Sequence, residues 1–201
     1  MRFSGAVLTG GSSSRMGTDK AFVEIDGVPM AGRARHALVA AGAAEVLAIG
    51  GDSRRLATLG FDARPDSAPG EGPLAGIIDA LAAATESLVV VLACDQPEVG
   101  ARLIRRLVSS FGPVDDAVVP IVNGRAQPLT AGYATRAGAR LREAFDAGER
   151  APWRALEHLE WRALHGVDAA QVRDVDDPDD LARYAARSRI STEQATSNDE
   201  G

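Results

Sequence analysis

The chain has 201 residues, a formal net charge of −6 at pH 7, 25% charged residues and a single cysteine. This length suffices for one α/β domain with a sizeable core and is too short for two comfortable ones. The acidic balance argues against nonspecific binding to nucleic acid, one cysteine excludes an internal disulfide, and no apolar run is long enough to span a bilayer. We therefore expect a cytoplasmic protein that binds neither nucleic acid nor membrane.

The first predicted strand, residues 3–8, runs directly into a loop rich in glycine and serine. From Leu8 to Lys20 the sequence reads Leu-Thr-Gly-Gly-Ser-Ser-Ser-Arg-Met-Gly-Thr-Asp-Lys, with Thr9 and Ser12 among its hydroxyl residues. This spacing matches neither a Walker A loop nor the Rossmann fingerprint. The loop therefore has to be judged by its residue types.

Those residue types are the ones that a phosphate site requires. Gly10, Gly11 and Gly17 can turn successive backbone N–H groups toward an anion, because glycine tolerates positive φ and has no Cβ. Arg15 and Lys20 supply the positive charge that a triphosphate needs. Glycines alone would suit a loop packed for steric reasons, but glycines with both cations favour a phosphate site with Arg15 and Lys20 in catalytic roles.

Strand and helix signals then alternate along the chain. This order is typical of an α/β, three-layer Rossmann-like fold, with a mostly parallel sheet flanked by helices. An Asn-Gly turn near residue 123 predicts a small antiparallel extension. Strands are predicted at residues 46–49, 60–64, 88–94, 117–122, 127–133 and 161–167, and helices at residues 29–41, 54–59, 137–145 and 153–159. Pro73 opens a further helix whose apolar face runs to Leu81, and the apolar residues at 103, 104, 107 and 111 predict another.

A constrained loop with three prolines precedes the helix that Pro73 opens. It follows a predicted strand, which is where open α/β sheets bind ligands. Asp66 in this loop can accept two hydrogen bonds from a base with adjacent N–H donors, such as guanine, or it can stabilise the turn. Both interpretations of Asp66 remain open from the residues alone.

The continuous apolar run from Leu88 to Cys94 predicts a central strand buried on both faces, with Cys94 as a structural thiol. It ends in Asp95-Gln96-Pro97. A carboxylate at the carboxyl end of a central strand can hold Mg²⁺ against nucleotide phosphates. Asp95 is thus a predicted metal ligand and catalytic residue, and capping of the next helix is the weaker alternative.

Acidic residues dominate the end of the ordered sequence. Residues 172–175 are predicted to form a terminal strand, and Pro178 to open a helix with carboxylates in its first turn. Asp176, just before this helix, is the acidic residue best placed for chemistry. We expect a single domain over residues 1–186 and a disordered tail over residues 187–201, where no apolar period survives.

Four motifs in this order resemble the molybdenum cofactor guanylyltransferase (MobA-like) family, a branch of the Rossmann-like nucleotidyltransferases. The resemblance covers about residues 3 to 185. Its motifs are the loop from Leu8 to Lys20, Gly72-Pro-Leu-Ala-Gly76, Asp95-Gln-Pro97 and Asp176-Asp-Pro-Asp-Asp-Leu181.

The resemblance implies transfer of GMP from GTP to the terminal phosphate of molybdopterin, with Mg²⁺, or Mn²⁺ in its place, as the metal. It further implies a molybdenum-insertion protein and molybdoenzyme chaperones as partners. Asp66 falls where the family reads guanine, Lys20 where it binds phosphates, and Asp95 where it binds metal, with Asp176 as a second candidate ligand. The nucleotide site that it predicts comprises Leu8, Thr9, Gly10, Gly11, Ser12, Arg15, Lys20, Asp66, Gly72, Pro73, Leu74 and Asp95.

Two departures leave alternatives open. Family members often have asparagine where this chain has Asp174 and Asp176, and aspartates there are also common in the related cytidylyl-transferring branch. That branch usually reads Leu-Ala-Ala-Gly at the first loop, so the paired glycine keeps guanine ahead. The alternatives are cytidylyl transfer to molybdopterin, transfer to a sugar phosphate or phospholactate, and an inactive nucleotide-binding regulator.

Overall fold

The computed structural model describes residues 1–10 and 19–184. Its centre is an eight-stranded sheet in the order β10-β7-β9-β6-β1-β4-β5, with β8 paired to β7. β1 pairs in parallel with β4 and with β6, and β4 pairs in parallel with β5. β9 pairs antiparallel with both β6 and β7. The strands are β1 (Ser4–Leu8), β4 (Glu45–Ile49), β5 (Asp62–Arg64), β6 (Leu88–Ala93), β7 (Ala117–Val122), β8 (Arg125–Ala126), β9 (Thr130–Ala134) and β10 (Trp161–Leu164).

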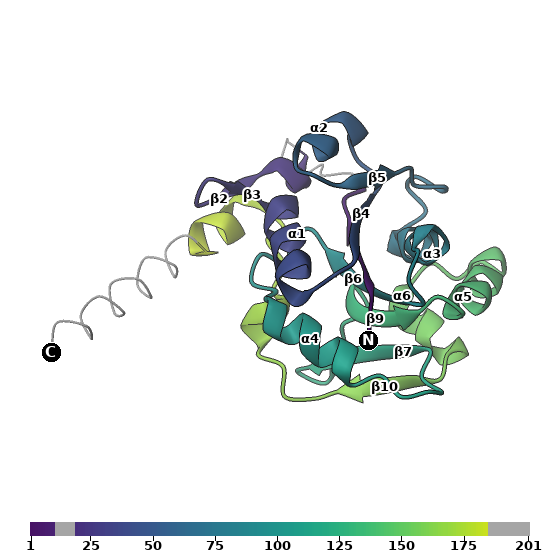
Figure 1. The fold of residues 1–201 in the computed structure, drawn as a ribbon. Coiled ribbons are helices and arrows are strands. Elements are labelled where there is room, and N and C mark those ends of the chain that lie inside the picture. The colour runs from purple at the N-terminus through teal and green to yellow at the C-terminus, as the bar shows by residue number, and fades with distance from the viewer. Residues whose placement is uncertain (11–18, 185–201) are drawn as a thin grey trace, which may run out of the picture.

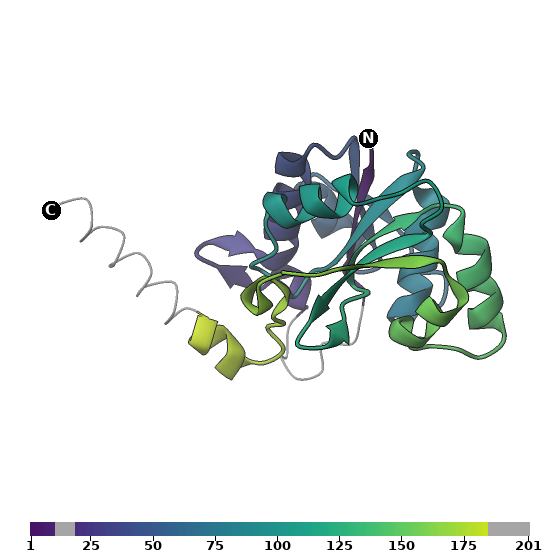
Figure 2. The same cartoon turned by 90° about the horizontal axis from the view of Figure 1, so that it is seen from below.

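Helices cover both faces of this sheet, as Figures 1 and 2 show. On one face lie α1 (Met30–Ala41), α2 (Ser53–Thr58) and α4 (Ala101–Ser109), whose apolar residues share one core cluster. On the other face lie α3 (Pro73–Ala83), α5 (Ala137–Asp146) and α6 (Pro152–Ala155) with the 3-10 helix η2 (Leu156–His158). The predicted three-layer α/β fold with a small antiparallel extension is thus confirmed.

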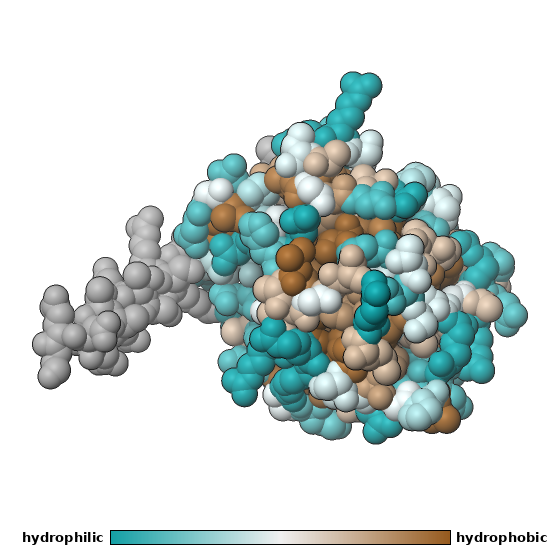
Figure 3. Space-filling view, viewed as in Figure 1, coloured by the Kyte–Doolittle hydropathy of each residue, from teal (hydrophilic) through white to brown (hydrophobic). Residues whose placement is uncertain are grey.

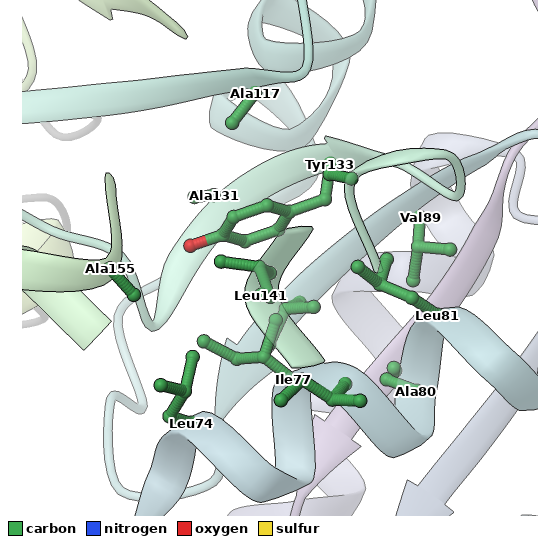
Figure 4. Packing of buried hydrophobic residues seen from close by; sticks show 14 of the residues in the cluster. Leu74, Ile77, Ala80, Leu81, Val89, Ala117, Ala131, Tyr133, Leu141 and Ala155 are labelled. Atoms are coloured by element: carbon green, nitrogen blue, oxygen red, sulfur yellow. The ribbon is translucent and has the colours of Figure 1, made fainter. Parts of the chain in front are cut away.

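Buried apolar side chains hold the three layers together. Tyr133 on β9 is 1% exposed and packs among Leu141 of α5 and Ile77 and Leu81 of α3 (Figure 4). Its buried hydroxyl donates a hydrogen bond of 2.7 Å to the carbonyl of Pro128, because a buried hydroxyl without a partner is costly. Tyr133 therefore fixes the loop before β9 to the core.

The surface differs in character from these layers. In the view of Figure 3, hydrophilic side chains surround apolar residues near the middle of the face. No helix within residues 1–10 and 19–184 combines the length and apolar character needed to cross a membrane.

The strand order reverses at β1, which lies between β4 and β6. The chain passes from β1 through α1 to β4 and on to β5 on one side, and it then returns from β5 through α3 to β6 on the other. In open α/β sheets, a crevice forms at such a switch point, beyond the carboxyl ends of the strands. Leu8 and Ala93 therefore end their strands side by side at this crevice.

The prediction of a terminal strand at residues 172–175 was wrong. Asp168 instead caps a 3-10 helix, η3 (Ala169–Val172), by accepting a hydrogen bond from the Ala170 N–H. Val172 and Val175 are buried in different apolar clusters, so their hydrophobicity reflects two separate contacts and not one strand. Residues 178–184 are helical, as the proline predicted; the predicted domain end at residue 186 and the tail at 187–201 lie outside the described residues.

A small hairpin of β2 (Glu24–Ile25) and β3 (Val28–Pro29) stands apart from the main sheet, after the 3-10 helix η1 (Lys20–Phe22). Ile25 and Met30 form an apolar cluster with Val175. Figures 1 and 2 both show the C-terminal segment, in yellow, beside this hairpin. The closing acidic segment is thereby anchored next to this hairpin.

Candidate active site

Two adjoining cavities open at the switch point. The first, of about 230 Å³, is lined by Lys20, Asp95 and Asp174 among others and is called the lysine cavity. The second, of about 210 Å³, is lined by Asp66, Ile49 and several glycines and is called the Asp66 cavity. Both include Leu8, Gly10 and Pro73 in their walls. The two cavities therefore lie side by side along the crevice.

The floor of the site is backbone packed against backbone. Gly10 lies so close to Gly50 that a Cβ on Gly50 would come within 2.8 Å of the Gly10 Cα, and φ of Gly50 is +78°. The Gly10 N–H and the Thr9 N–H each donate to the Ile49 carbonyl at 3.0 Å. The Gly10 N–H is thus used to join β1 to β4, and it does not supply the anion cradle that the sequence suggested.

The side chain of Thr9 has a structural role, as its backbone N–H does. Its hydroxyl donates to the Gly50 carbonyl at 2.9 Å, and the residue is only 5% exposed. This bond holds the first turn of the loop against the end of β4. Thr9 still lines the lysine cavity, so its backbone faces the site while its hydroxyl faces inward.

Asp66 stabilises its turn through one carboxylate oxygen, and the residue also lines the Asp66 cavity. Its Oδ1 accepts a hydrogen bond of 2.9 Å from the Ala68 N–H, which stabilises the turn. Its Oδ2 lies 3.4 Å from the position that a Cβ on Gly10 would occupy, on the wall of the Asp66 cavity. One carboxylate oxygen therefore holds the loop and the other faces the cavity.

Lys20 lies between two carboxylates from distant parts of the chain. Its Nζ is 2.5 Å from Asp176 Oδ1 and 3.4 Å from Asp95 Oδ2. Asp19 starts η1 by accepting from the Ala21 N–H at 3.1 Å, and this cap sets the direction in which Lys20 leaves the backbone. Lys20 is the only lysine in a chain with 22 basic residues, so this site uses a flexible point charge where the rest of the chain uses arginine.

Burial and charge act in opposite directions on these groups. Burial alone would lower the pKa of Lys20, but its hydrogen bond to Asp176 and the charges of Asp95 and Asp176 raise that pKa above its ordinary value. Burial raises the pKa of Asp95, and Lys20 opposes this rise. Burial also raises the pKa of Asp174, against a hydrogen bond from Gln96. The local charge is negative, which favours a cation.

The segment after β6 brings these carboxylates together. The Asp95 carbonyl accepts from the Val175 N–H at 2.8 Å. Gln96, 5% exposed, donates from Nε2 to Asp174 Oδ1 at 2.9 Å and accepts from the Thr130 hydroxyl. Asp95-Gln96 therefore fastens the closing acidic segment to the edge of the sheet.

The residues present fit a hard divalent cation. Asp95 and Asp176 both contact the Nζ of Lys20, so their oxygens lie close together at the carboxyl end of β6. Carboxylate oxygens are the donors that Mg²⁺ prefers, and Mg²⁺ is commonly held by one or two of them together with substrate phosphates. Residues 1–10 and 19–184 contain no cluster of three His, Cys, Asp or Glu side chains that could hold a metal by itself.

Cys94 also lines the lysine cavity. Burial raises the pKa of its thiol. A thiol with a raised pKa carries little thiolate, and the thiolate is the nucleophile. This agrees with the structural assignment of Cys94 from the sequence.

Of the other predicted site residues, some line a cavity and others do not. Gly72, with φ +96°, precedes the first turn of α3 and lines the Asp66 cavity, whereas Leu74 is fully buried in the core under that helix. Gly11, Ser12, Arg15 and Gly17 lie outside the described residues.

Several residues that line the cavities are absent from the predicted site, among them Asp174, Leu129 and Ile49. Asp174 enters the sequence analysis only as a departure from the family's asparagine, and no pattern in the sequence singles out Leu129. Ile49 was the most accessible of the three to prediction, because it is the last residue of a buried strand before Gly50-Gly51.

Comparison with known proteins gives three findings. The family model described as "MobA-like NTP transferase domain" matches residues 5–164. A probable molybdenum cofactor guanylyltransferase from Bacillus licheniformis is 38% identical over 146 residues, covering 71% of this chain and 74% of that protein. Another, from Deinococcus radiodurans, is 31% identical over 189 residues, covering 94% of this chain and 96% of that protein.

The fold has similar solved structures as well. Molybdopterin-guanine dinucleotide biosynthesis protein A from Archaeoglobus fulgidus matches with a TM-score of 0.75 and 24% identity, over 94% of this chain and 100% of that chain. A nucleotidyl transferase from Methanothermobacter matches with a TM-score of 0.76 and 17% identity, over 94% and 98%. At these identities the structural likeness supports the fold.

Proposed function

Because this chain belongs to the MobA-like NTP transferase family and is therefore a nucleotidyltransferase, we propose that it transfers GMP from GTP to the terminal phosphate of molybdopterin. The products are molybdopterin guanine dinucleotide and pyrophosphate. The observation that carries the proposal is the meeting of Lys20 and Asp95 in the lysine cavity, which adjoins the Asp66 cavity. One end of the site thus suits phosphates, and the other suits a base with paired N–H donors.

The reaction is a displacement at phosphorus. An oxygen of the acceptor phosphate attacks the α-phosphorus of GTP, a new P–O bond forms, and the bond from the α-phosphorus to the bridging oxygen breaks, releasing pyrophosphate. Protein groups assist such transfers mainly by in-line positioning and by neutralising charge. Lys20 binds phosphate oxygens, and Asp66 fixes the base at the other end of the nucleotide.

Asp95 would hold Mg²⁺, with Asp176 as a second oxygen donor. When bound, the ion supplies positive charge that stabilises the phosphate oxygens during displacement. Lys20 must then release at least one of its two carboxylates, and the phosphates of GTP offer it equivalent oxygens. Arg15, in the loop outside the described residues, adds a further cation in this proposal.

Purified protein incubated with Mg²⁺, molybdopterin and each of the four NTPs in turn tests the proposal. We expect pyrophosphate release with GTP and the matching dinucleotide product by mass spectrometry. Release with CTP alone would assign the chain to cytidylyl transfer. A relative of known activity, assayed with the same molybdopterin, shows that the acceptor is competent. Tight binding of GTP without release of pyrophosphate would then contradict an enzymatic role.

Asp66→Asn is expected to impair recognition of guanine without disturbing the loop. Asparagine retains an oxygen for the Ala68 N–H, which is the turn bond at 2.9 Å, but replaces the other acceptor with a donor. An unsatisfied donor pair costs 1–3 kcal/mol, so kcat/KM for GTP should fall about 10- to 100-fold. Steady-state kinetics with GTP, CTP and ATP, beside the thermal midpoint, measure the effect.

The control for this variant is Asp79→Asn, since Asp79 also orders the loop through Ser67 but lies outside both cavities. Unchanged kcat/KM for GTP in Asp66→Asn would remove Asp66 from base recognition.

Asp176→Asn is expected to raise the Mg²⁺ concentration that gives half-maximal rate, by about fivefold. The substitution keeps the shape and removes one anionic oxygen from the pair around Lys20. Rate measured against free Mg²⁺ at saturating GTP reports this directly. An unchanged dependence of the rate on Mg²⁺ would show that Asp176 is not a metal ligand and that its role is limited to the contact with Lys20.

A further inference from the structure

A third cavity, of about 660 Å³, adjoins the lysine cavity and has no role in the nucleotide site described above. It is called the aromatic cavity, because Trp153 and Trp161 are in its wall. Leu129 and Asp174 line both this cavity and the lysine cavity. The two spaces therefore adjoin at these residues.

One wall of the aromatic cavity is the hairpin after β7. Asn123 and Gly124, with φ of +50° and +74°, turn the chain so that β8 pairs back on β7. The loop that follows is fixed by the Tyr133 hydroxyl on the Pro128 carbonyl, and by the Ala93 N–H on the Leu129 carbonyl at 2.8 Å. This wall is thus anchored to the core and is formed before any ligand binds.

Both tryptophans of the chain also line this cavity. Trp153 is at the start of α6, and Trp161 begins β10. They are 55% and 37% exposed, which leaves a large apolar surface open to water. The Arg154 guanidinium lies 4.8 Å from the centroid of the Trp153 ring and restrains it on one side. Two exposed indoles beside a functional site are typical of a surface that binds a planar ligand.

We propose that the aromatic cavity binds the planar heteroaromatic ring of the phosphorylated acceptor, which is the pterin under the proposed function. This inference rests on that function for the identity of the acceptor. The acceptor phosphate must reach the lysine cavity, and the junction at Leu129 and Asp174 provides that path. The volume lies in the range of 300–1,000 Å³ that is common for small-molecule sites.

The place of each cavity favours this orientation over its reverse. The acceptor phosphate has to lie in the lysine cavity to reach the α-phosphorus of GTP, whereas the indoles line only the aromatic cavity, together with Pro152, Leu156 and the charged Arg125. A neutral ring gains stacking and apolar contact against the indoles. Trp153 and Trp161 are therefore the acceptor-specificity residues in this proposal.

Intrinsic fluorescence tests the proposal without turnover, because the chain contains just two tryptophans and both line this cavity. Titration of the full-length protein with molybdopterin should give a saturable change in tryptophan emission. The free amino-acid analogue N-acetyltryptophanamide corrects for absorption by the pterin. Trp153→Phe and Trp161→Phe then assign the change to each ring.

Kinetics with the alanine variants provide the second readout. Trp153→Ala and Trp161→Ala should each raise KM for molybdopterin about tenfold, since removal of an aromatic platform under a heterocycle costs about 1–3 kcal/mol. The KM for GTP should stay within twofold of the wild-type value. Val114→Ala is the matched control, because Val114 is an apolar residue 74% exposed outside these three cavities.

The outcomes separate this inference from the proposed function. A saturable emission change supports the inference even if no GMP transfer occurs, in which case the proposed function alone fails. Turnover with molybdopterin that is unaffected in both alanine variants overturns the inference and leaves the function intact. Absence of any saturable change with the wild-type protein also overturns it, as does emission that responds to a protein partner and not to the pterin.

Discussion

Lys20→Ala is expected to lower kcat about 100- to 1,000-fold, the loss usually seen when one positioned charge-stabilising donor is removed from a site. Lys20 is the cation that the described residues place in the lysine cavity, and its Nζ already contacts the carboxylates of Asp95 and Asp176. Without it, these carboxylates face one another and the phosphates lose a ligand. Single-turnover and steady-state rates with GTP measure the loss.

The same variant has an expected pH signature. Burial raises the pKa of Asp95, and the Lys20 charge holds it down. Removal of Lys20 therefore raises that pKa further, so more Asp95 is protonated at a given pH, and the acid limb of the residual rate should move to higher pH. Near-normal turnover in Lys20→Ala would count against the whole assignment.

Chemical modification gives an independent check, because Lys20 is the only lysine in the chain. Acetylation with an amine-selective reagent should inactivate the protein, and GTP with Mg²⁺ should protect it. Peptide mass spectrometry distinguishes Lys20 from the terminal amine. Modification at Lys20 with full retention of activity would contradict a role on the phosphates.

Asp95→Asn is expected to lower kcat about 1,000-fold and to raise the Mg²⁺ requirement beyond the accessible range, since a metal contributes several kcal/mol to such displacements. The change is isosteric, and the backbone carbonyl of Asp95 keeps its bond to the Val175 N–H at 2.8 Å. The closing segment should therefore stay in place. Rate against Mg²⁺ and Mn²⁺, together with circular dichroism, measures the effect.

Asp168→Asn is the matched control for this variant. Asp168 also precedes a short helix, where asparagine caps as well as aspartate does, and it lies outside the three cavities. Its rate and metal dependence should equal those of the wild-type protein. If Asp95→Asn keeps the metal dependence of the wild-type protein, Asp95 is not the metal ligand and another carboxylate must hold the ion.

The positions of the strand ends were predictable from short stretches of sequence. The run from Leu88 to Ala93 forms the central strand β6, and the first strand ends at Leu8 beside it. Since parallel strands place their carboxyl ends at one edge, the residues that follow them had to meet there. The sequence therefore predicts that the loop from Leu8 to Lys20 and the carboxylate of Asp95 lie at one crevice.

Contacts between distant segments required the tertiary structure. Lys20 meets Asp176 across 156 positions of sequence. The sequence favours Asp176 among the neighbouring aspartates by its place before the last helix, but it does not predict the contact with Lys20. That contact depends on the Val175 bond to Asp95 and on the burial of Val175 with Ile25 and Met30. The sequence pattern at residues 172–175 instead suggested a strand, because isolated buried valines and strand valines look alike in one dimension.

The sequence by itself determined the fold class, the nucleotidyltransferase family and the residue types at the phosphate end, because these depend on local periodicity and on motifs within single loops. Only the tertiary structure decided that the Gly10 N–H joins two strands, that one Asp66 oxygen holds its loop while the other lies near Gly10, and that Trp153 and Trp161 line one cavity. The physical reason is that hydrogen-bond partners and cavity walls are set by packing between elements far apart in the chain, which local sequence does not encode.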